Sequence, residues 1–249
     1  MSDDIDIAHK PERPLGHRAF GQIPHLPGSR RGPSDRGLND GQTRIATKVA
    51  QDKYDLVVVQ EKLDGSNVAI ANIDGAIVPL TRAGYHARDS FYAQHRVFAT
   101  WVARNEGAAL AVLAPGERLA GEWLLQAHGT VYDLTGRSPF VALDIMHDGH
   151  ERLPWFEFVQ RVAPYFSIAP TLHVGCPQSI GDALDKLGDY GYYGAQDRAE
   201  GLVWRVERLG KVDFMTKYVR SDKVDGAYFD RDEPVWNVDK GAWPWTVIW

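Results

Sequence analysis

The sequence predicts an α+β fold dominated by antiparallel strands. Three observations support this expectation: short runs of apolar and β-branched residues recur along the chain, an Asp-Gly turn separates two of them, and only a few stretches carry apolar residues at helical spacing. The chain has 249 residues, of which 44% are hydrophobic and 24% charged. This is the composition of a soluble globular protein with one large domain or two small ones.

The expected strands begin after Tyr54. Residues 56–59 form an apolar, β-branched run typical of a buried strand, and this run leads directly into Glu61-Lys62-Leu63-Asp64-Gly65. Alternating apolar residues on both sides of Asp74-Gly75 predict a hairpin of strands 67–73 and 76–81. Four further strands are expected at 118–125, 140–146, 201–207 and 212–219.

Helical spacing of apolar residues occurs in four places. The longest of these stretches is 90–113, and Pro115-Gly116 marks its end. Shorter patterns cover 43–50, 155–162 and 179–187. We therefore expect a few helices that flank the sheets.

The two ends of the chain differ in composition from the middle. Residues 1–50 are rich in glycine, proline and arginine and carry a charge balance of +2, whereas the remainder carries −7. We expect this partly basic segment to be an extended arm on a core domain that spans 51–225. The tail, 226–249, contains Trp236, Trp243, Trp245 and Trp249, and we expect it to pack on the domain.

The arm contains three arginines and no acid between His17 and Arg31. A basic patch that grips phosphates and a solvated loop with chance charge both explain this distribution. Within it, the His-Leu-Pro-Gly-Ser-Arg sequence at 25–30 favours a proline turn over a phosphate contact.

Composition also excludes several classes of protein. The net charge of −5 argues against a basic nucleic-acid-binding coat over the whole surface. Cys176 is the single cysteine, so no internal disulfide is possible, which fits a reducing, cytoplasmic setting with an inert thiol. No apolar run is long enough to cross a bilayer, and the acidic N-terminus is not a secretory signal. No Cys/His set has zinc-binding spacing.

The segment Glu61-Lys62-Leu63-Asp64-Gly65-Ser66-Asn67 carries the most chemical information. A lysine at the end of a buried strand loses its proton more easily when burial and nearby cations disfavour its charged form, and a neutral amine is a nucleophile. Gly65 would let the backbone turn tightly beside a phosphate. Taken alone, Lys-x-Asp-Gly is also a common structural turn at a strand end.

Later strands repeat a carboxylate or a lysine at their edges. One cluster would then hold a lysine nucleophile, several acids that bind ribose hydroxyls or a divalent metal, and a second lysine that neutralises phosphate charge. These residues occur in Gly121-Glu122, Asp144, Glu200-Gly201 and Lys217.

The order of these segments resembles the motifs of the covalent nucleotidyltransferases, the superfamily of ATP-dependent DNA ligases, RNA ligases and mRNA capping enzymes. Motif I of that superfamily is Lys-x-Asp-Gly, which Lys62, Asp64 and Gly65 match. The four later motifs follow in the right order, matched by Gly121-Glu122, the Asp144 strand, Glu200-Gly201 and the Lys217 strand.

The likeness is greatest to the RNA ligases. In that branch the residue before the nucleophile is commonly glutamate, as Glu61 is, and motif I ends in asparagine, as Asn67 does. Arg82, after the hairpin, also fits the branch. The resemblance implies a nucleotidyltransferase domain of the ligase adenylylation type (ATP-grasp-like), with antiparallel sheets that enclose the nucleotide pocket.

The resemblance also implies roles for the catalytic residues. Lys62 would attack ATP and carry AMP, Glu200 would position a metal or the nucleophile, and Lys217 would contact the α-phosphate. Asp144 and Glu200 are the candidate ligands of Mg²⁺ or Mn²⁺. Motif V often has a second lysine, but Met215 occupies that position here.

The remaining matched residues would bind the nucleotide. Glu61 would lie near the adenine amino group, and Glu122 would accept hydrogen bonds from the ribose hydroxyls. Asn67 and Arg82 would face the phosphates, with Arg82 a candidate for the strand-end phosphate. The implied set is completed by Asp64, Gly65, Lys217 and Leu143, the last at a position where an aromatic often stacks on adenine.

The implied activity is ATP-dependent joining of a 5′-phosphate to a 3′-hydroxyl, with RNA preferred, in RNA repair. Three alternatives stay open: a DNA-nick ligase, an end-adenylating enzyme, and an end-binding module that does not ligate. The segment after Lys217 is shorter than the C-terminal domains of many such enzymes. We therefore expect grip on the substrate from the core, the arm or a partner protein.

Overall fold

The strands of the computed structural model form two sheets. The model describes residues 12–147, 149–224, 226–228 and 233–238. One sheet has four strands in the order β10-β9-β1-β8, every neighbouring pair antiparallel. The bounds of its strands are β1 Asp55–Lys62, β8 Thr171–Gly175, β9 Gly201–Arg208 and β10 Lys211–Val219.

The second sheet has six strands in the order β3-β2-β4-β5-β6, with β7 beside β5. Its pairs are antiparallel except β5–β7. The bounds are β2 Ser66–Ile73, β3 Ala76–Thr81, β4 Arg118–Trp123, β5 Phe140–His147, β6 Glu151–Arg152 and β7 Ser167–Ile168. The predicted α+β class with antiparallel sheets is confirmed.

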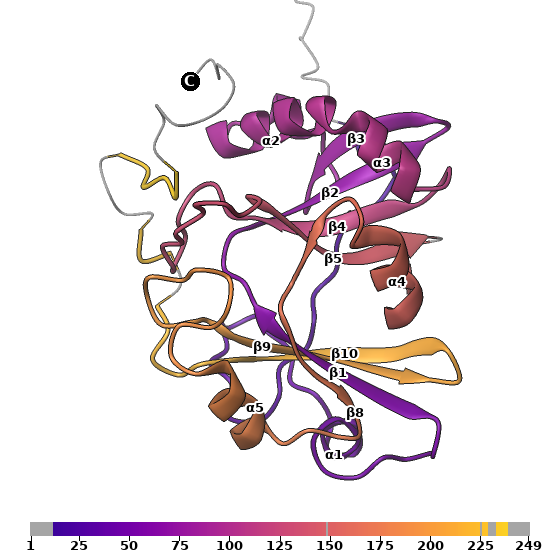
Figure 1. Ribbon diagram of the computed structural model, residues 1–249, viewed down its shortest axis with the longest axis vertical. Coiled ribbons are helices and arrows are strands. Elements are labelled where there is room, and N and C mark those ends of the chain that lie inside the picture. The colour runs from indigo at the N-terminus through magenta and orange to yellow at the C-terminus, as the bar shows by residue number, and fades with distance from the viewer. Residues whose placement is uncertain (1–11, 148, 225, 229–232, 239–249) are drawn as a thin grey trace, which may run out of the picture.

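Helices flank both sheets (Figure 1). Two of them, α2 (Ala93–Arg104) and α3 (Glu106–Val112), cover the outer side of the six-stranded sheet, after the short 3₁₀ helix η1 (Ala87–Asp89). The other sheet carries α1 (Asp40–Thr47) and α5 (Ile180–Leu187). The remaining helix, α4, spans Trp155–Val162.

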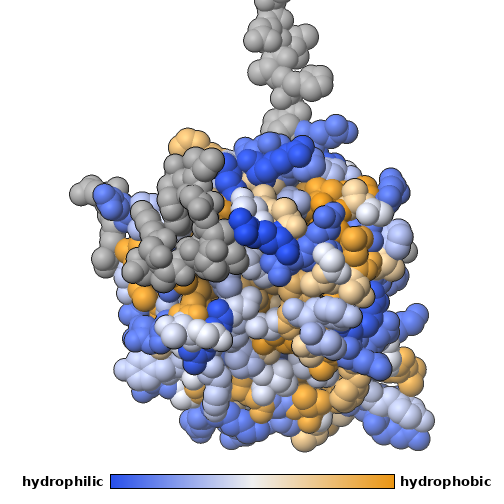
Figure 2. All heavy atoms as spheres, turned by 45° about the horizontal axis from the view of Figure 1, so that its top comes forward, coloured by the Kyte–Doolittle hydropathy of each residue, from blue (hydrophilic) through white to orange (hydrophobic). Residues whose placement is uncertain are grey.

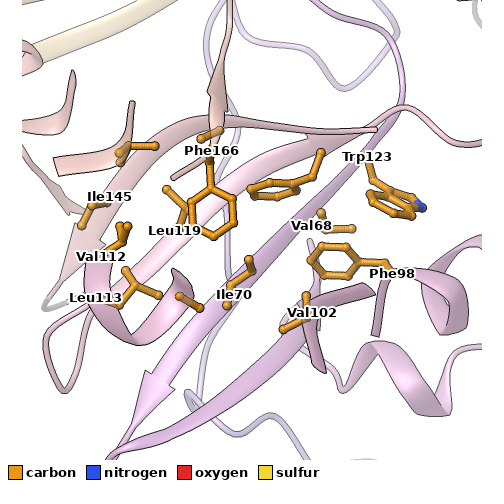
Figure 3. Packing of buried hydrophobic residues seen from close by; sticks show 14 of the residues in the cluster. Val68, Ile70, Phe98, Val102, Val112, Leu113, Leu119, Trp123, Ile145 and Phe166 are labelled. Carbon is orange, nitrogen blue, oxygen red and sulfur yellow. The ribbon is translucent and has the colours of Figure 1, made fainter. Parts of the chain in front are cut away.

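Aromatic and branched side chains hold the six-stranded sheet against α2 (Figure 3). Val68 and Ile70 of β2 lie beside Phe98 of α2, and the rings of Phe98 and Trp123 meet edge to face with centroids 5.3 Å apart. Burial of apolar surface on this scale is the main favourable term in folding. The surface in Figure 2 is mostly hydrophilic, with apolar side chains interspersed.

Strand pairing brings together residues that are far apart in sequence. In the β1–β9 register Lys62 faces Gly201, and in the β2–β4 register Asn67 faces Glu122. Lys217 of β10 faces Val203 of β9. Strand pairing therefore brings the predicted site residues together near the end of β1.

The described part of the arm runs along the core. The backbone N–H of Leu26 donates to the carbonyl of Lys217 at 2.8 Å, and the N–H of Ala19 donates to the carbonyl of Arg82 at 3.1 Å. A turn at 25–29 is closed by His25 Nδ1 and Ser29 Oγ at 2.7 Å. The proline turn is therefore confirmed.

The structure corrects three sequence predictions. The predicted helix 90–113 is two helices, because the Asn105 side chain donates to the carbonyl of Trp101 at 2.8 Å and competes with helical pairing at the break. The short predicted helix 43–50 is α1, which begins earlier because Asn39 caps it, its side chain accepting from the N–H of Gln42. Strands β6, β7 and β8 were not predicted, since two have only two residues and β8 lacks an alternating buried pattern.

The tail is only partly described. Trp236 forms an isolated antiparallel β-bridge with Gln126, and its side chain packs against the main hydrophobic cluster. Trp243, Trp245 and Trp249 lie outside the described residues. In the part of the chain that the structure describes, no helix has both the length and the apolar character to cross a membrane.

Candidate active site

A cavity of about 910 Å³ is lined by residues of both sheets, and it contains the end of β1. The four-stranded sheet contributes Lys62, Val203 and Lys217, and the six-stranded sheet contributes Glu122 and Leu143. Four residues of the arm, Glu12, Phe20, Gly21 and Ile23, also line it. Of the predicted nucleotide-binding and catalytic residues, Glu61, Lys62, Asp64, Gly65, Asn67, Arg82, Glu122, Leu143 and Lys217 all line this cavity.

Lys62 ends β1, and its ammonium donates a hydrogen bond to Oε2 of Glu200. Burial by itself lowers the pKa of Lys62, but the carboxylates of Glu200, Glu122 and Asp64 outweigh burial and hold the pKa above its ordinary value. The sequence predicted the opposite direction, because it could not show that three carboxylates surround the amine. Lys62 is therefore a charged ammonium in the empty cavity.

The two acids nearest to Lys62 are buried. Burial raises the pKa of Glu200 to about 7, although Lys62 opposes the shift. Burial also raises the pKa of Glu122, whose Oε1 accepts from the N–H of Gly65 at 3.1 Å. A site with this much buried negative charge favours cations.

Asp64 is engaged by the loop that follows β4. Its Oδ2 accepts from the N–H of Gly129 at 2.9 Å and from the hydroxyl of Thr130 at 3.2 Å. Lys223 lies 3.9 Å from the same oxygen. The Asp64 carboxylate therefore holds one wall of the cavity in place.

Gly65 is required by packing. A Cβ at this position would lie 2.5 Å from the carbonyl oxygen of Trp123, a contact that no side chain can make. The sequence suggested a tight turn beside a phosphate; the structure gives close approach to β4 as the reason for glycine.

Glu61 lines the cavity, and one of its carboxylate oxygens has a backbone partner while the buried Oε1 has none among the described residues. Its Oε2 accepts from the N–H of Tyr192 at 2.7 Å, in the loop after α5. Side chains on a strand point alternately to its two faces. Val57, Val59 and Glu61 therefore lie on the same face of β1, and the two valines pack in the hydrophobic cluster that includes residues of α5. Burial raises the pKa of Glu61 to about 7.

Asn67 and Arg82 lie on the same wall of the cavity. Asn67 Nδ2 donates to the carbonyl of Gly121 at 3.3 Å, and its buried Oδ1 has no hydrogen-bond partner among the described residues. Arg82 is exposed and donates to the carbonyl of Gly21 at 3.4 Å. Both side chains therefore keep hydrogen-bonding capacity for a ligand.

Lys217 faces the cavity from β10. Burial lowers the pKa of Lys217, and the positive charge of Lys62 lowers it further. Leu143 and Met215 add apolar surface to the same cavity, consistent with an apolar pocket for a base.

The metal assignment of Asp144 does not fit its surroundings. Arg205 Nη2 lies 2.7 Å from Oδ1, and Arg152 donates to Oδ2. Both carboxylate oxygens are therefore taken by guanidinium groups, and the side chain is fully buried. No group of three or more His, Cys, Asp or Glu side chains with metal-binding geometry occurs among the described residues.

Sequence reasoning missed a polar cluster on the cavity wall. Ser66, His95 and His128 lie in hydrogen-bonding contact there and all line the cavity. No spacing signal connects these three residues, since they come from β2, α2 and the loop after β4.

Comparison with known proteins agrees with the motif order. Two antiparallel sheets that enclose a cavity with a strand-end lysine, buried carboxylates and a second lysine define a nucleotidyltransferase fold. The model of the RNA ligase family matches residues 55–219, and the chain therefore belongs to that family. No curated protein matches significantly.

Solved structures of Naegleria gruberi RNA ligase share the fold. A mutant in the apo form superposes with a TM-score of 0.51 at 19% identity, covering 81% of this chain and 59% of that chain. A mutant with ATP and Mn gives a TM-score of 0.51 at 18% identity, covering 85% of this chain and 61% of that chain. A mutant with AMP and Mn gives 0.50 at 17% identity, covering 79% and 59%. The chain thus spans about three fifths of the length of these structures.

Proposed function

We propose that the protein is an ATP-dependent RNA ligase that joins 5′-phosphate and 3′-hydroxyl ends through a lysyl-AMP intermediate. The observation that carries the proposal is the pairing of Lys62, which lines the cavity together with Glu122 and Lys217, with the buried carboxylate of Glu200. Family membership supports RNA as the substrate, and solved relatives with ATP or AMP support the nucleotide.

Lys62 must lose a proton before it can react. Glu200 is hydrogen bonded to the ammonium and takes up a proton near neutral pH, so it is positioned to accept that proton. The neutral Nζ then attacks the α-phosphorus of ATP, an N–P bond forms, and the bond to the departing pyrophosphate breaks. Lys217 supplies positive charge beside the phosphorus as the oxygens gain negative charge.

The next two steps transfer AMP and seal the ends. An oxygen of the 5′-phosphate attacks the lysyl-AMP phosphorus, and the N–P bond breaks. The 3′-hydroxyl then attacks the activated 5′-phosphorus, a phosphodiester forms, and AMP departs. Arg82 is exposed and keeps further guanidinium N–H donors that suit the strand-end phosphate, and the unpartnered Oδ1 of Asn67 on the same wall is an acceptor.

A divalent cation fits this site. Mg²⁺ is usually held by one or two carboxylates together with water and substrate phosphates, and Glu122 is the buried carboxylate beside Lys62 that takes no part in the proton transfer; Glu200 would be a ligand only in its deprotonated form. Bound there, Mg²⁺ or Mn²⁺ would neutralise phosphate charge. Asp144 is not proposed as a ligand.

The proposal is tested by incubating the protein with α-labelled ATP and Mg²⁺ and then denaturing it. Label should stay on the wild-type chain and be absent from Lys62→Ala, with Lys53→Ala as a control at an exposed lysine. Label retained by Lys62→Ala would refute the covalent role of Lys62. Nicked duplexes with RNA or DNA on either side of the nick then distinguish RNA sealing from DNA sealing and from arrest after adenylylation.

A further inference from the structure

Four side chains on the cavity wall form a continuous hydrogen-bonded chain that the ligation mechanism above does not use. Ser90 Oγ lies 2.8 Å from His95 Nδ1, and His95 Nε2 lies 3.2 Å from Ser66 Oγ. Ser66 Oγ in turn lies 3.5 Å from Nε2 of His128. We call the set of Ser66, His95 and His128 the histidine relay.

The neighbouring groups indicate which atom donates and which accepts each hydrogen bond of the relay. Gln94 Nε2, which can only donate, lies 3.3 Å from His128 Nε2, so that ring nitrogen is an acceptor. The Ser66 hydroxyl then donates to His128 and accepts from His95 Nε2–H, which leaves His95 Nδ1 to accept from Ser90. In this arrangement both imidazoles are neutral.

The relay also has room for an added proton. Gln94 is buried, and its Oε1 has no hydrogen-bond partner among the described residues. Rotation of the amide would turn this oxygen toward His128 and let it accept from a protonated ring. A buried amide oxygen without a partner is unusual, and an N–H at Nε2 of His128, in the imidazolium or in the other neutral tautomer, would supply the partner it lacks.

The part of the cavity that contains the relay is rich in groups that bind anions. Arg82 and His86 line the cavity together with Ser66, His95 and His128. The charged groups that act on His128 are Asp64 and Lys62. The other titratable lining residues are Glu12, Glu61, Tyr85, Asp89, Tyr92, Glu122, Asp144 and Lys217. Ser66 directly precedes Asn67, so the relay adjoins the wall proposed to face phosphates.

We propose that the histidine relay is a phosphate-binding subsite that takes up a proton when a phosphate group enters the cavity. The inference rests on the proposed function for the source of the phosphate, which is either the departing pyrophosphate of ATP or the 5′-phosphate of the strand. A phosphate dianion beside the relay favours the imidazolium forms, and each imidazolium adds a charged N–H donor.

Electrostatics of the empty cavity supports this assignment. Burial lowers the pKa of His95 to about 4, with a smaller effect of His128 in the same direction. Burial also lowers the pKa of His128, where Asp64 opposes and Lys62 reinforces the shift. Both rings therefore start uncharged near neutral pH and can gain a proton on binding.

The first experiment needs no catalysis. Inorganic pyrophosphate is titrated into the protein between pH 8 and 6 by calorimetry in two buffers of different ionisation heat, and histidine ring resonances are followed by NMR. We expect binding to tighten by about tenfold per pH unit for each proton taken up, with His95 and His128 resonances moving toward their protonated positions. His95→Gln and His128→Gln should each flatten the pH dependence, whereas His173→Gln, at a half-buried histidine outside the cavity, should not.

The two phosphate sources are distinguished by single-turnover rates. A changed pH profile of lysyl-AMP formation in the His95 and His128 variants identifies pyrophosphate, and a changed profile of AMP transfer from preadenylylated protein to a 5′-phosphate strand identifies the strand end. Pyrophosphate affinity that is independent of pH, with unmoved His95 and His128 resonances, would overturn the relay proposal. Absence of lysyl-AMP with intact proton-linked pyrophosphate binding would instead overturn the proposed ligase function alone.

Discussion

The ammonium of Lys62 is hydrogen bonded to the carboxylate of Glu200, although 138 residues separate them in the sequence. The contact exists because Lys62 ends β1 beside Gly201, the first residue of β9. It keeps the lysine protonated until the chemistry of the site removes the proton, and it makes Glu200 the nearest group that can take that proton.

Replacement of Glu200 by glutamine should slow lysyl-AMP formation by about 10²-fold, the usual scale for losing a proton-transfer group. The pH at which the rate is half-maximal should also fall, because the carboxylate that raises the pKa of Lys62 most is gone. Single-turnover labelling across pH measures both effects. The matched control is Glu207→Gln, a buried carboxylate that accepts from the N–H of Trp155 outside the cavity; an equal loss there would contradict a specific role for Glu200.

Glu61 should make the protein less stable as pH rises from about 4.5 to 7. Burial raises its pKa from 4.5 to about 7, so in this window the folded protein binds more protons at Glu61 than the unfolded chain does. In Glu61→Gln, where the amide oxygen can still accept from Tyr192, this loss should be absent. The gain over wild type should reach up to about 3 kcal/mol above pH 7, the limit set by a shift of this size.

Urea unfolding of Glu61→Gln and wild type at several pH values measures that difference. The Michaelis constant for ATP, measured on the same proteins, separates a structural role of the carboxylate from contact with adenine. Parallel stability curves for the two proteins would contradict the raised pKa of Glu61.

Asp144→Asn should destabilise the fold strongly, by about 3–5 kcal/mol, because the buried guanidinium of Arg205 then keeps only Glu207, at 3.6 Å, and Arg152 loses its carboxylate partner. Thermal and urea unfolding measure this loss. Glu151→Gln, at an exposed acid, serves as the control. A variant that kept full stability but required much more Mg²⁺ would instead restore Asp144 as a metal ligand.

Gly65→Ala should lower both stability and adenylylation, because the new methyl group collides with the backbone of β4 and shifts the loop that carries Asp64. The matched control is Gly107→Ala in α3, where nothing lies within 4 Å of the added Cβ. There we expect a gain of about 0.5–1 kcal/mol, since alanine favours a helix more than glycine does. Unfolding curves of the two variants should therefore move in opposite directions.

Much of the site could be predicted because its reactive residues occur in short local sequence motifs. Lys62, Asp64 and Gly65 are adjacent, and the later carboxylates begin or lie on recognisable strands. The metal assignment of Asp144 failed because its two arginine partners have no fixed spacing from it. The assignment of Glu61 to the adenine side stays a prediction: the residue lines the cavity, and the structure adds the contact of its Oε2 with the N–H of Tyr192.

The sequence by itself determined the α+β class, the hairpin at Asp74-Gly75 and the residues around Lys62, because strand periodicity, turn chemistry and motif order are local properties of a chain. Only the tertiary structure decided the charge of that lysine. The carboxylates of Glu200 and Glu122 reach it through pairing between distant strands, and the pKa depends on burial and on charges a few ångströms away. Tertiary packing likewise joined Ser66, His95 and His128, which no sequence spacing connects.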